Sequence, residues 1–269
     1  MIIKELTPFS KRNNYIGIGQ RIRYPFIYKY MPVSTAEICL KNNNVRFSKP
    51  STWKDPFEAL FYTANYNSVM PLPPINTNLF AYCVTSNPEC EAAWQMYQNQ
   101  ERHEPCVRFK IYLGQFRNFI YEYIYPKGTA YEGKVDYNLT GKKIISLCNP
   151  KNKLYTTLFE QFNLKNYLNL LLLKRPFFKY EEEIRFLIQT PYNSVADYIY
   201  IPLSWSQCLH SIQLPPDCPD ELKIRIKEAL KFNLKKCKND YPQYHYRGIP
   251  IIDNPIYANL SHITIQRIP

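Results

Sequence analysis

Two glutamates and an arginine alternate within one short stretch of the chain, Phe177–Ile188. Read as a strand, this stretch places Glu181, Glu183 and Arg185 on one face, because side chains alternate along a strand. The aromatic and β-branched residues between them favour the strand over a helix with a surface ion pair. The polar face is then either a water-facing surface or one wall of a polar cleft. In a cleft, its carboxylates could stabilise a developing positive charge.

A second set of acids lies in the motif Asp55-Pro56-Phe57-Glu58. Asp at the N-cap, Pro at the first helical position and Glu at the third predict a capping box at a helix start. A helix start facing a pocket would instead offer free N–H groups to an anionic ligand. Asp55 and Glu58 would compete with such an anion, so the capping interpretation is favoured.

The composition predicts a folded, basic protein. The chain has 269 residues, of which 45% are hydrophobic and 16% aromatic, enough to bury a core in one large domain or two small ones. Its formal net charge is +12, with a sequence pI near 9.2. Such a charge attracts nucleic acid, nucleotides or anionic membrane without choosing among them.

The cysteines and histidines do not predict a metal site. Eight cysteines are scattered without a CxxC, and the four histidines have no metal-ligand spacing. The N-terminus lacks the pattern of a signal peptide, and the apolar run Leu168–Leu173 is too short to cross a bilayer. We therefore expect a reduced, cytoplasmic protein without a metal or a membrane segment.

The elements that must position these residues follow from periodicity and turn chemistry. Residues 1–25 are polar and weakly patterned and are interpreted as an N-terminal arm, and residues 26–269 as a single α+β domain with a helical insertion near 142–173. The domain opens with a strand, a helix and a second strand. The strands that should meet around a cleft contain Tyr28, Phe47, Tyr82, Val107 and Phe186. Further strands are expected at 134–137, 198–201 and 211–214 and in the tail from 249 to 265.

Two predicted helices carry residues that chemistry could use. Trp94 and Tyr97 form an aromatic stripe, which is more often core than a binding surface. The helix at 219–236 carries a face of lysines, which either keeps the helix soluble or contacts phosphates. His103, in a loop between a helix and a strand, is expected at the surface.

Several motifs together resemble the bacterial domain-of-unknown-function 2971 family. They occur in this order: Tyr28-Lys29-Tyr30, Arg46–Pro50, Asp55–Glu58, Trp94 with Tyr97, and Tyr180–Arg185. The chain departs from the family at Lys54, where the family usually has Asn, and at Phe178, where it usually has Trp. The Pro105-Cys106 junction also lacks the usual Gly. The family is associated with phage-defence genes, which implies a defence or toxin role and a defence or antitoxin partner.

The order of elements also looks like the ADP-ribosyltransferase-like fold, in which two small mixed sheets flank an NAD-binding cleft. This resemblance implies catalytic roles for Glu183, with Glu181 beside it, and for Tyr30 at the first-strand position. Ser48 or Tyr97 would take the middle position. The first-strand His or Arg that is usual in this fold is absent here. The residues that would bind NAD are Lys29, Arg46 and Arg185 at the pyrophosphate, Trp94 at a ring, and Ser48 and Tyr97.

The function that follows is an NAD-dependent ADP-ribosyltransferase-like effector or toxin of an anti-phage or toxin–antitoxin system. Cleavage of the nicotinamide–ribose bond develops positive charge on the sugar, which a carboxylate such as Glu183 would stabilise. The acceptor, whether protein, nucleic acid or water, stays open. The alternative is a non-enzymatic basic module that binds nucleic acid or a partner protein. We expect Glu183→Gln to leave folding intact, on the premise that this carboxylate is half-exposed.

Overall fold

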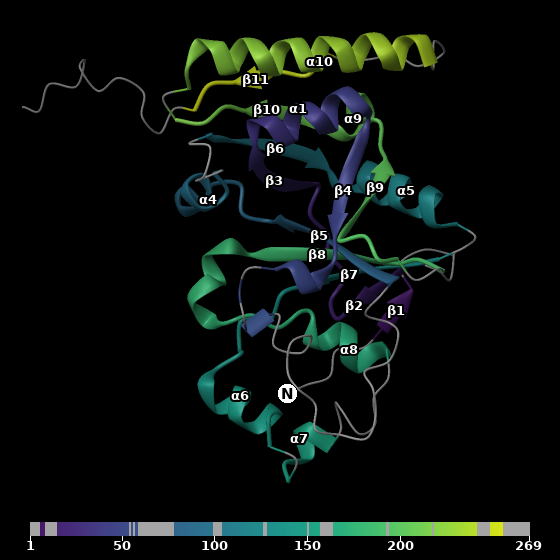
Figure 1. Ribbon diagram of the computed structural model, residues 1–269, viewed down its shortest axis with the longest axis vertical. Coiled ribbons are helices and arrows are strands. Elements are labelled where there is room, and N and C mark those ends of the chain that lie inside the picture. The colour runs from purple at the N-terminus through teal and green to yellow at the C-terminus, as the bar shows by residue number, and fades with distance from the viewer. Residues whose placement is uncertain are drawn as a thin grey trace, which may run out of the picture. The chain divides into compact units, whose positions relative to one another are not determined.

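The computed structural model describes residues 6–8, 15–53, 55, 57–58, 78–98, 104–125, 128–149, 151–156, 164–191, 194–216, 218–240 and 248–254 (Figure 1). The chain forms two compact units, and each is described by itself. Unit 1 comprises Met1–Ile27, Asn44–Cys90 and Leu113–Leu203. Unit 2 comprises Tyr28–Asn43, Glu91–Tyr112 and Ser204–Pro269. In the part of the chain that the structure describes, no helix is both long and apolar enough to span a bilayer.

Unit 1 is built on a mixed sheet. Its strands run in the order β1 (Leu6–Pro8), β2 (Tyr15–Ile18), β7 (Thr129–Lys134), β8 (Glu183–Gln189), β5 (Leu79–Thr85), β4 (Asn44–Ser48) and β9 (Tyr198–Pro202). The β2–β7 pair is parallel and the other pairs are antiparallel. Strand β8 is paired with β5 over all seven residues and with β7 from Ile184 to Gln189, and six of its seven residues are buried.

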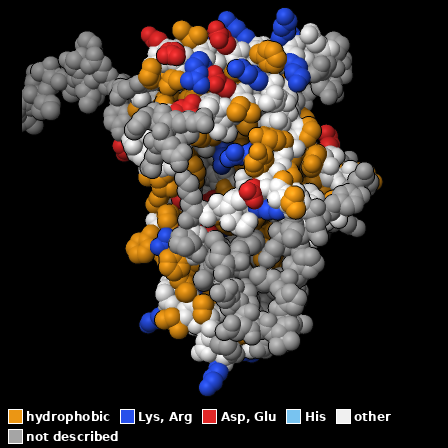
Figure 2. All heavy atoms as spheres, in the orientation of Figure 1, with side chains coloured by type: hydrophobic (Ala, Val, Ile, Leu, Met, Phe, Trp, Pro, Cys, Tyr) orange, Lys and Arg blue, Asp and Glu red, His pale blue; other side chains and the backbone are white. Residues whose placement is uncertain are grey.

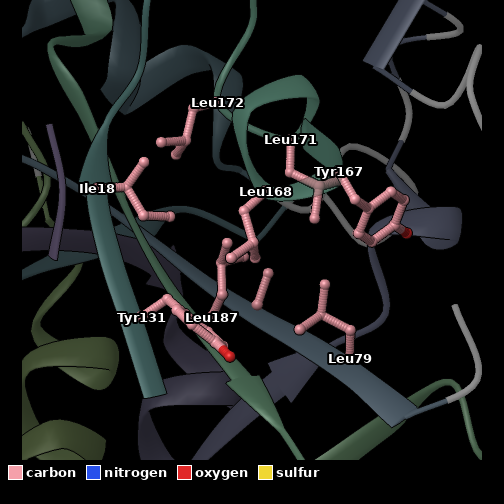
Figure 3. Close-up of a cluster of buried hydrophobic side chains, with 9 residues drawn as sticks. Ile18, Leu79, Tyr131, Tyr167, Leu168, Leu171, Leu172 and Leu187 are labelled. Carbon is pink, nitrogen blue, oxygen red and sulfur yellow. The ribbon is translucent and has the colours of Figure 1, made fainter. Parts of the chain in front are cut away.

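Helices cover both faces of β8. Phe186 packs edge-on against Phe116 of α5 (Leu113–Ile124), with ring centroids 5.0 Å apart. Leu187 points to the other face and joins an apolar cluster under α8 (Leu164–Leu170), as Figure 3 shows. Residues alternate between the faces of a strand, so Glu183 and Arg185 share the α8 face with Leu187.

The packing of the same cluster explains why the residue at position 133 is a glycine. Gly133 of β7 lies opposite Arg185 in the strand pairing. A Cβ at Gly133 would come within 2.5 Å of Leu172 Cδ1, which is too close for a real contact. Glycine therefore lets the chain that follows α8 approach the sheet beside Arg185.

The other helical segments of unit 1 are short. They are α6 (Gly141–Leu147), α7 (Lys153–Tyr155) and the 3-10 helices η1 (Pro50–Thr52) and η3 (Pro176–Glu181). Thr140 caps α6 by accepting a hydrogen bond from the Lys143 N–H. The helical insertion predicted near 142–173 is thus described as separate short helices, and part of it, including Leu158 and Phe162, lies outside the described residues.

Unit 2 has its own strands and helices. The strands β3 (Phe26–Pro32, most of which belongs to this unit), β6 (Cys106–Tyr112), β10 (Leu209–Gln213) and β11 (Ile251–Ile252) are neighbours in that order. Its helices are α1 (Val33–Asn42), α4 (Glu91–Met96), α9 (Trp205–Cys208) and α10 (Asp220–Asp240). Helices α1 and α10 pack together, and Asn233 Nδ2 of α10 donates a hydrogen bond of 2.7 Å to the Leu40 carbonyl. The Leu40 carbonyl, at the end of α1, also accepts a hydrogen bond from the Asn43 N–H.

The sequence predicted the main elements correctly. The five strands expected to contain Tyr28, Phe47, Tyr82, Val107 and Phe186 are all present. The helix after Pro32 and the helix at 219–236 are also confirmed as α1 and α10. Helices and strands are mixed, as expected. The cleft between two sheets and the single domain over 26–269 stay predictions, because the two units are described separately.

Three predictions are wrong or fall outside the described residues. Tyr15–Ile18 is a paired strand with buried residues, so this part of the segment interpreted as an N-terminal arm belongs to the sheet. The strand predicted at 134–137 ends at Lys134 instead, and Asp136 makes only an isolated bridge to Leu173. His103, Tyr257 and the strand expected at 263–265 lie outside the described residues.

Candidate active site

The stretch around Glu181 is not one continuous strand. Pro176 starts the 3-10 helix η3, which ends at Glu181, and Glu182 has a left-handed backbone with φ of 40°. The strand β8 begins only at Glu183. The prediction that Glu181 and Glu183 share one strand face is therefore wrong. The turn at Glu182 nevertheless brings both carboxylates into contact with the same side chain, the ammonium group of Lys174.

Glu183 and Arg185 form a bidentate pair on the α8 face of β8. Arg185 Nε donates to Glu183 Oε1 at 2.8 Å, and Nη2 donates to Oε2 at 3.0 Å. The two fixed N–H directions of a guanidinium match a carboxylate in this geometry. Arg185 is 1% exposed and Glu183 is 5% exposed. The face is thus not water-facing, and the premise that the Glu183 carboxylate is half-exposed is wrong.

Lys174 connects this pair to two more carboxylates. Its Nζ lies 2.6 Å from Glu181 Oε2, 3.1 Å from Glu183 Oε2 and 3.1 Å from Glu58 Oε1. Glu58 Oε1 also accepts a hydrogen bond of 3.0 Å from Arg185 Nη2. We refer to Glu58, Lys174, Glu181, Glu183 and Arg185 as the charge cluster. All of its members belong to unit 1.

The backbone fixes Lys174 at the end of the segment after α8. Its N–H donates to the Asp136 carbonyl at 3.1 Å, and its own carbonyl accepts from the Leu139 N–H at 3.2 Å. Sequence reasoning missed Lys174. The signal that could have found it is a cation placed directly after the apolar run Leu168–Leu173, where burial of the neighbouring chain demands a partner for the charge.

The charges of the cluster do not balance. Three carboxylates face two cations, so one negative charge is in surplus when all five groups are ionised. Burial raises the pKa of the Glu181 carboxyl to about 7, and the Lys174 ammonium offsets this effect only in part. Glu181 therefore exchanges a proton near neutral pH, and its protonated form removes the surplus negative charge of the cluster.

Glu183 behaves in the opposite way. Burial alone would raise its pKa, but Arg185 and Lys174 together hold the pKa of this carboxyl well below its usual value. Burial likewise opposes the charge of Lys174, and the surrounding carboxylates raise the pKa of its ammonium. Two neighbouring carboxyls thus differ strongly in proton affinity, an arrangement typical of acid–base sites.

Aromatic rings and a hydroxyl complete the surroundings. The Arg185 guanidinium lies 4.1 Å from the ring centroid of Trp53, and Lys174 Nζ lies 4.9 Å from that of Phe178. These contacts compensate part of the cost of burying the two cations. The Glu183 N–H donates to the Tyr137 hydroxyl at 2.7 Å, which fixes the start of β8.

The capping motif is only half as predicted. Asp55 Oδ1 accepts a hydrogen bond of 3.0 Å from the Phe57 N–H, as an N-cap should. Its other oxygen pairs with Arg175 at 3.2 Å. Glu58, by contrast, turns its carboxylate to the charge cluster, so the capping box does not explain this residue.

The two predicted binding residues on β4 lie away from the charge cluster. Ser48 pairs with Ala81, which pairs with Leu187, four residues along β8 from Glu183. At about 3.3 Å per residue and 4.8 Å per strand, Ser48 is roughly 16 Å from Glu183. Arg46 is exposed, and its guanidinium lies 5.5 Å from the ring centroid of Tyr198.

The remaining predicted residues form a group in unit 2. Tyr30 meets Trp94 edge-on at 5.0 Å and stacks with Tyr97 at 6.1 Å. Lys29 Nζ lies 5.7 Å from the Tyr97 ring centroid. Tyr30 and Trp94 are buried, as expected of an aromatic stripe in a core. Sequence reasoning missed Arg108 as a member of this group, although its guanidinium lies 6.0 Å from the Tyr30 ring centroid.

Comparisons with known proteins give weak likenesses only. No protein-family model and no curated protein matches the chain, so the resemblance to the domain-of-unknown-function 2971 family is not confirmed. Among solved structures, the chain is similar to DarT of Thermus sp. 2.9 in complex with NAD+, with a TM-score of 0.34, 10% identity, and coverage of 87% of this chain and 98% of that chain. DarT of the same organism in complex with ADP-ribosylated ssDNA is similar with a TM-score of 0.33, 11% identity, and coverage of 86% and 94%. TM-scores this low decide nothing about this chain.

Within the described residues, no group of three His, Cys, Asp or Glu side chains could hold a metal ion. The carboxylates of the charge cluster are instead occupied by cations of the chain itself. The chemistry open to this site is therefore that of a fixed negative charge beside a carboxyl that can exchange a proton near neutral pH.

Proposed function

We propose that the chain is an ADP-ribosyltransferase-like enzyme that cleaves the nicotinamide–ribose bond of NAD at the charge cluster. One observation carries the proposal. Glu181 and Glu183 bind the same ammonium, yet the pKa of Glu181 is raised to about 7 while that of Glu183 is lowered. Carboxyls with strongly shifted pKa values cluster at functional sites.

Each carboxyl has a distinct role in this proposal. The ionised Glu183, whose two oxygens are held by Arg185 and Lys174, stabilises through its electrostatic field the positive charge that develops on the ribose as the C–N bond breaks and its electron pair leaves with nicotinamide. The nucleophile of the acceptor then bonds to the same carbon and gives its proton to the ionised form of Glu181.

Arg185 takes a different role from the one first expected. It is 1% exposed, and its donors are used by Glu183, Glu58 and the Leu171 carbonyl. It is therefore a positioning residue that orients Glu183, and not a ligand of the pyrophosphate. In unit 2, Lys29, Trp94 and Tyr97 remain proposed binding residues, and Tyr30 remains a proposed catalytic residue.

The biological setting proposed with this activity is that of an effector or toxin acting in a defence or toxin–antitoxin system. It derives from the resemblance of the sequence motifs. Expression of the wild-type chain in a bacterial host should then slow growth, and a variant without NAD cleavage should not.

The activity is tested by nicotinamide release from NAD. We expect Glu183→Gln to lower the rate by about a hundredfold or more, because it removes the charge that stabilises the transition state. Glu181→Gln is the variant expected to fold without loss, and it should lower acceptor modification while abolishing the rise in rate as the pH passes about 7. Glu122→Gln, an exposed acid on α5, is the matched control.

Two results would contradict the proposal. If the wild-type protein released no nicotinamide under any tested condition, the proposed enzymatic function would be wrong. Variants that are folded by urea titration and keep wild-type rates would show that the charge cluster serves only stability.

A second candidate function has its own observation. Helix α10 carries a stripe of exposed lysines at helical spacing, Lys227, Lys231, Lys235 and Lys238. Figure 2 shows Lys and Arg side chains along this helix with acids interspersed. A non-enzymatic basic module would use such a stripe to contact phosphates, with affinity that falls steeply with salt. Salt-sensitive binding without NAD cleavage would favour this candidate.

A further inference from the structure

The outward face of strands β4 and β9 presents two tyrosines and an arginine to solvent. Tyr198 and Tyr200 are 47% and 43% exposed, although tyrosine side chains in folded proteins are usually more buried than this. Their rings meet edge-on at 5.5 Å, and the Arg46 guanidinium lies 5.5 Å from the Tyr198 ring centroid. Figure 2 shows hydrophobic and Lys or Arg side chains side by side over β4 and β9. We refer to Arg46, Ser48, Tyr198 and Tyr200 as the β4–β9 face.

We propose that the β4–β9 face binds single-stranded nucleic acid, with bases stacked on Tyr198 and Tyr200 and a phosphate held by Arg46. No part of this proposal depends on NAD cleavage, and it assigns Arg46 and Ser48 to a surface different from the charge cluster.

The sheet fixes this face rigidly. Strands β4 and β9 pair over five residues, with Arg46 opposite Tyr200 and Ser48 opposite Tyr198. The alternate residues Val45, Phe47 and Ile201 are buried and anchor both strands. Tyr198 and Tyr200 are two residues apart, so they point the same way, with their Cα atoms roughly 6.5–7 Å apart and their rings in edge-on contact.

The side chains of the β4–β9 face favour a single-stranded nucleic acid as the ligand. Every base has a flat face that can stack on tyrosine, and bases are accessible in this way only when they are unpaired. Among the described residues, no carboxylate forms an ion pair with Arg46, so its charge is available to a phosphate. The net charge of +12 draws a polyanion toward the chain as a whole.

One nearby acid opposes binding and gives the proposal a sensitive test. Asp197 is exposed and directly precedes Tyr198. Its carboxylate repels a phosphate at this face, so Asp197→Asn should strengthen binding.

The test uses the full chain and fluorescein-labelled oligomers of thymidine and of uridine, measured by fluorescence anisotropy. We expect Tyr198→Ala and Tyr200→Ala each to weaken binding by at least about fivefold, while Phe at either position retains it. Arg46→Ala should lower the dependence of log K on log salt by about 0.7. The matched control is Tyr123→Ala on α5, since Tyr123 is also 43% exposed, and it should bind like wild type.

Several outcomes would overturn the proposal. These are no binding of either oligomer, an equal loss in Tyr123→Ala, or unchanged binding in both tyrosine variants. Loss of binding on replacing the α10 lysines, with no effect of the tyrosines, would place the contact on α10 instead. Tighter binding of a duplex than of a single strand would exclude base stacking as the mode. Because the readout is binding, these results are independent of whether the chain cleaves NAD.

Discussion

The described residues of unit 1 form buried ion pairs on both faces of its sheet. On the α5 face, Glu132 of β7 is fully buried and pairs with Arg117, whose Nε donates to Oε2 at 2.8 Å. The Tyr15 hydroxyl donates to the same oxygen at 2.9 Å. On the α8 face lies the charge cluster. The first set has one acid and one base, whereas the second has three acids and two bases.

This difference in balance separates two uses of buried charge. A balanced pair with satisfied hydrogen bonds can hold α5 against the sheet at any pH near neutrality. The charge cluster holds its elements together in the same way, but it also keeps a surplus carboxyl that exchanges a proton near pH 7. The surplus, and not burial itself, marks the second set as a candidate for catalysis.

The largest expected effect compares one acid from each set. Glu132→Gln leaves Arg117 with no anion in the set and should lower the free energy of unfolding by about 3 kcal/mol or more. Glu181→Gln leaves two acids facing two bases and should lower it little, or raise it, at pH 8. Urea unfolding of both variants checks this, and equal losses would show that Glu181 is paired as tightly as Glu132.

Measuring the free energy of unfolding over a series of pH values tests the titration of Glu181 more directly. Glu181 has a pKa of about 7 in the folded chain, above its ordinary value of 4.5, so between these values the folded state binds more protons than the unfolded state. Stability should therefore fall as the pH rises from about 5 to about 8, by on the order of 2–3 kcal/mol.

The low pKa of Glu183 acts in the opposite sense, since its contribution is present above the unfolded pKa and is lost as the pH falls through the folded one. In Glu181→Gln, the free energy of unfolding should no longer fall as the pH rises toward 8, but it should still fall at acidic pH. A Glu181→Gln variant with the same decline as wild type would assign the titration to another group.

The smallest expected effect concerns Asp55, at the edge of the charge cluster. Asp55→Ala removes the cap on the Phe57 N–H and the partner of Arg175, and should cost about 1 kcal/mol. Because Asp55 is outside the charge cluster, NAD affinity should stay nearly unchanged. Asp55→Asn, which keeps a capping oxygen, is the control. A large loss of affinity at an unchanged melting temperature would move Asp55 into the binding site.

The periodicity of the sequence was sufficient for the regular elements. Alternation in β8 correctly placed Glu183 and Arg185 on one face, and turn and capping residues correctly located α1 and α10. The same pattern failed at Glu181, because Pro176 and the left-handed Glu182 impose a 3-10 helix and a turn where the composition favours a strand. Predictions from local pattern depend on residue types, so they do not reveal a turn made by a single residue such as Glu182.

The sequence by itself determined which residues are charged and which of them share a strand face, since both follow from covalent order and local backbone geometry. The tertiary structure alone decided that this face is buried and which charges meet there. Glu58 reaches Arg185 across 127 positions of sequence, and Lys174 enters only because the chain after α8 packs onto the sheet beside Gly133. Burial and the sum of charges depend on such long-range packing, so the surplus carboxyl of Glu181 could not be found from spacing.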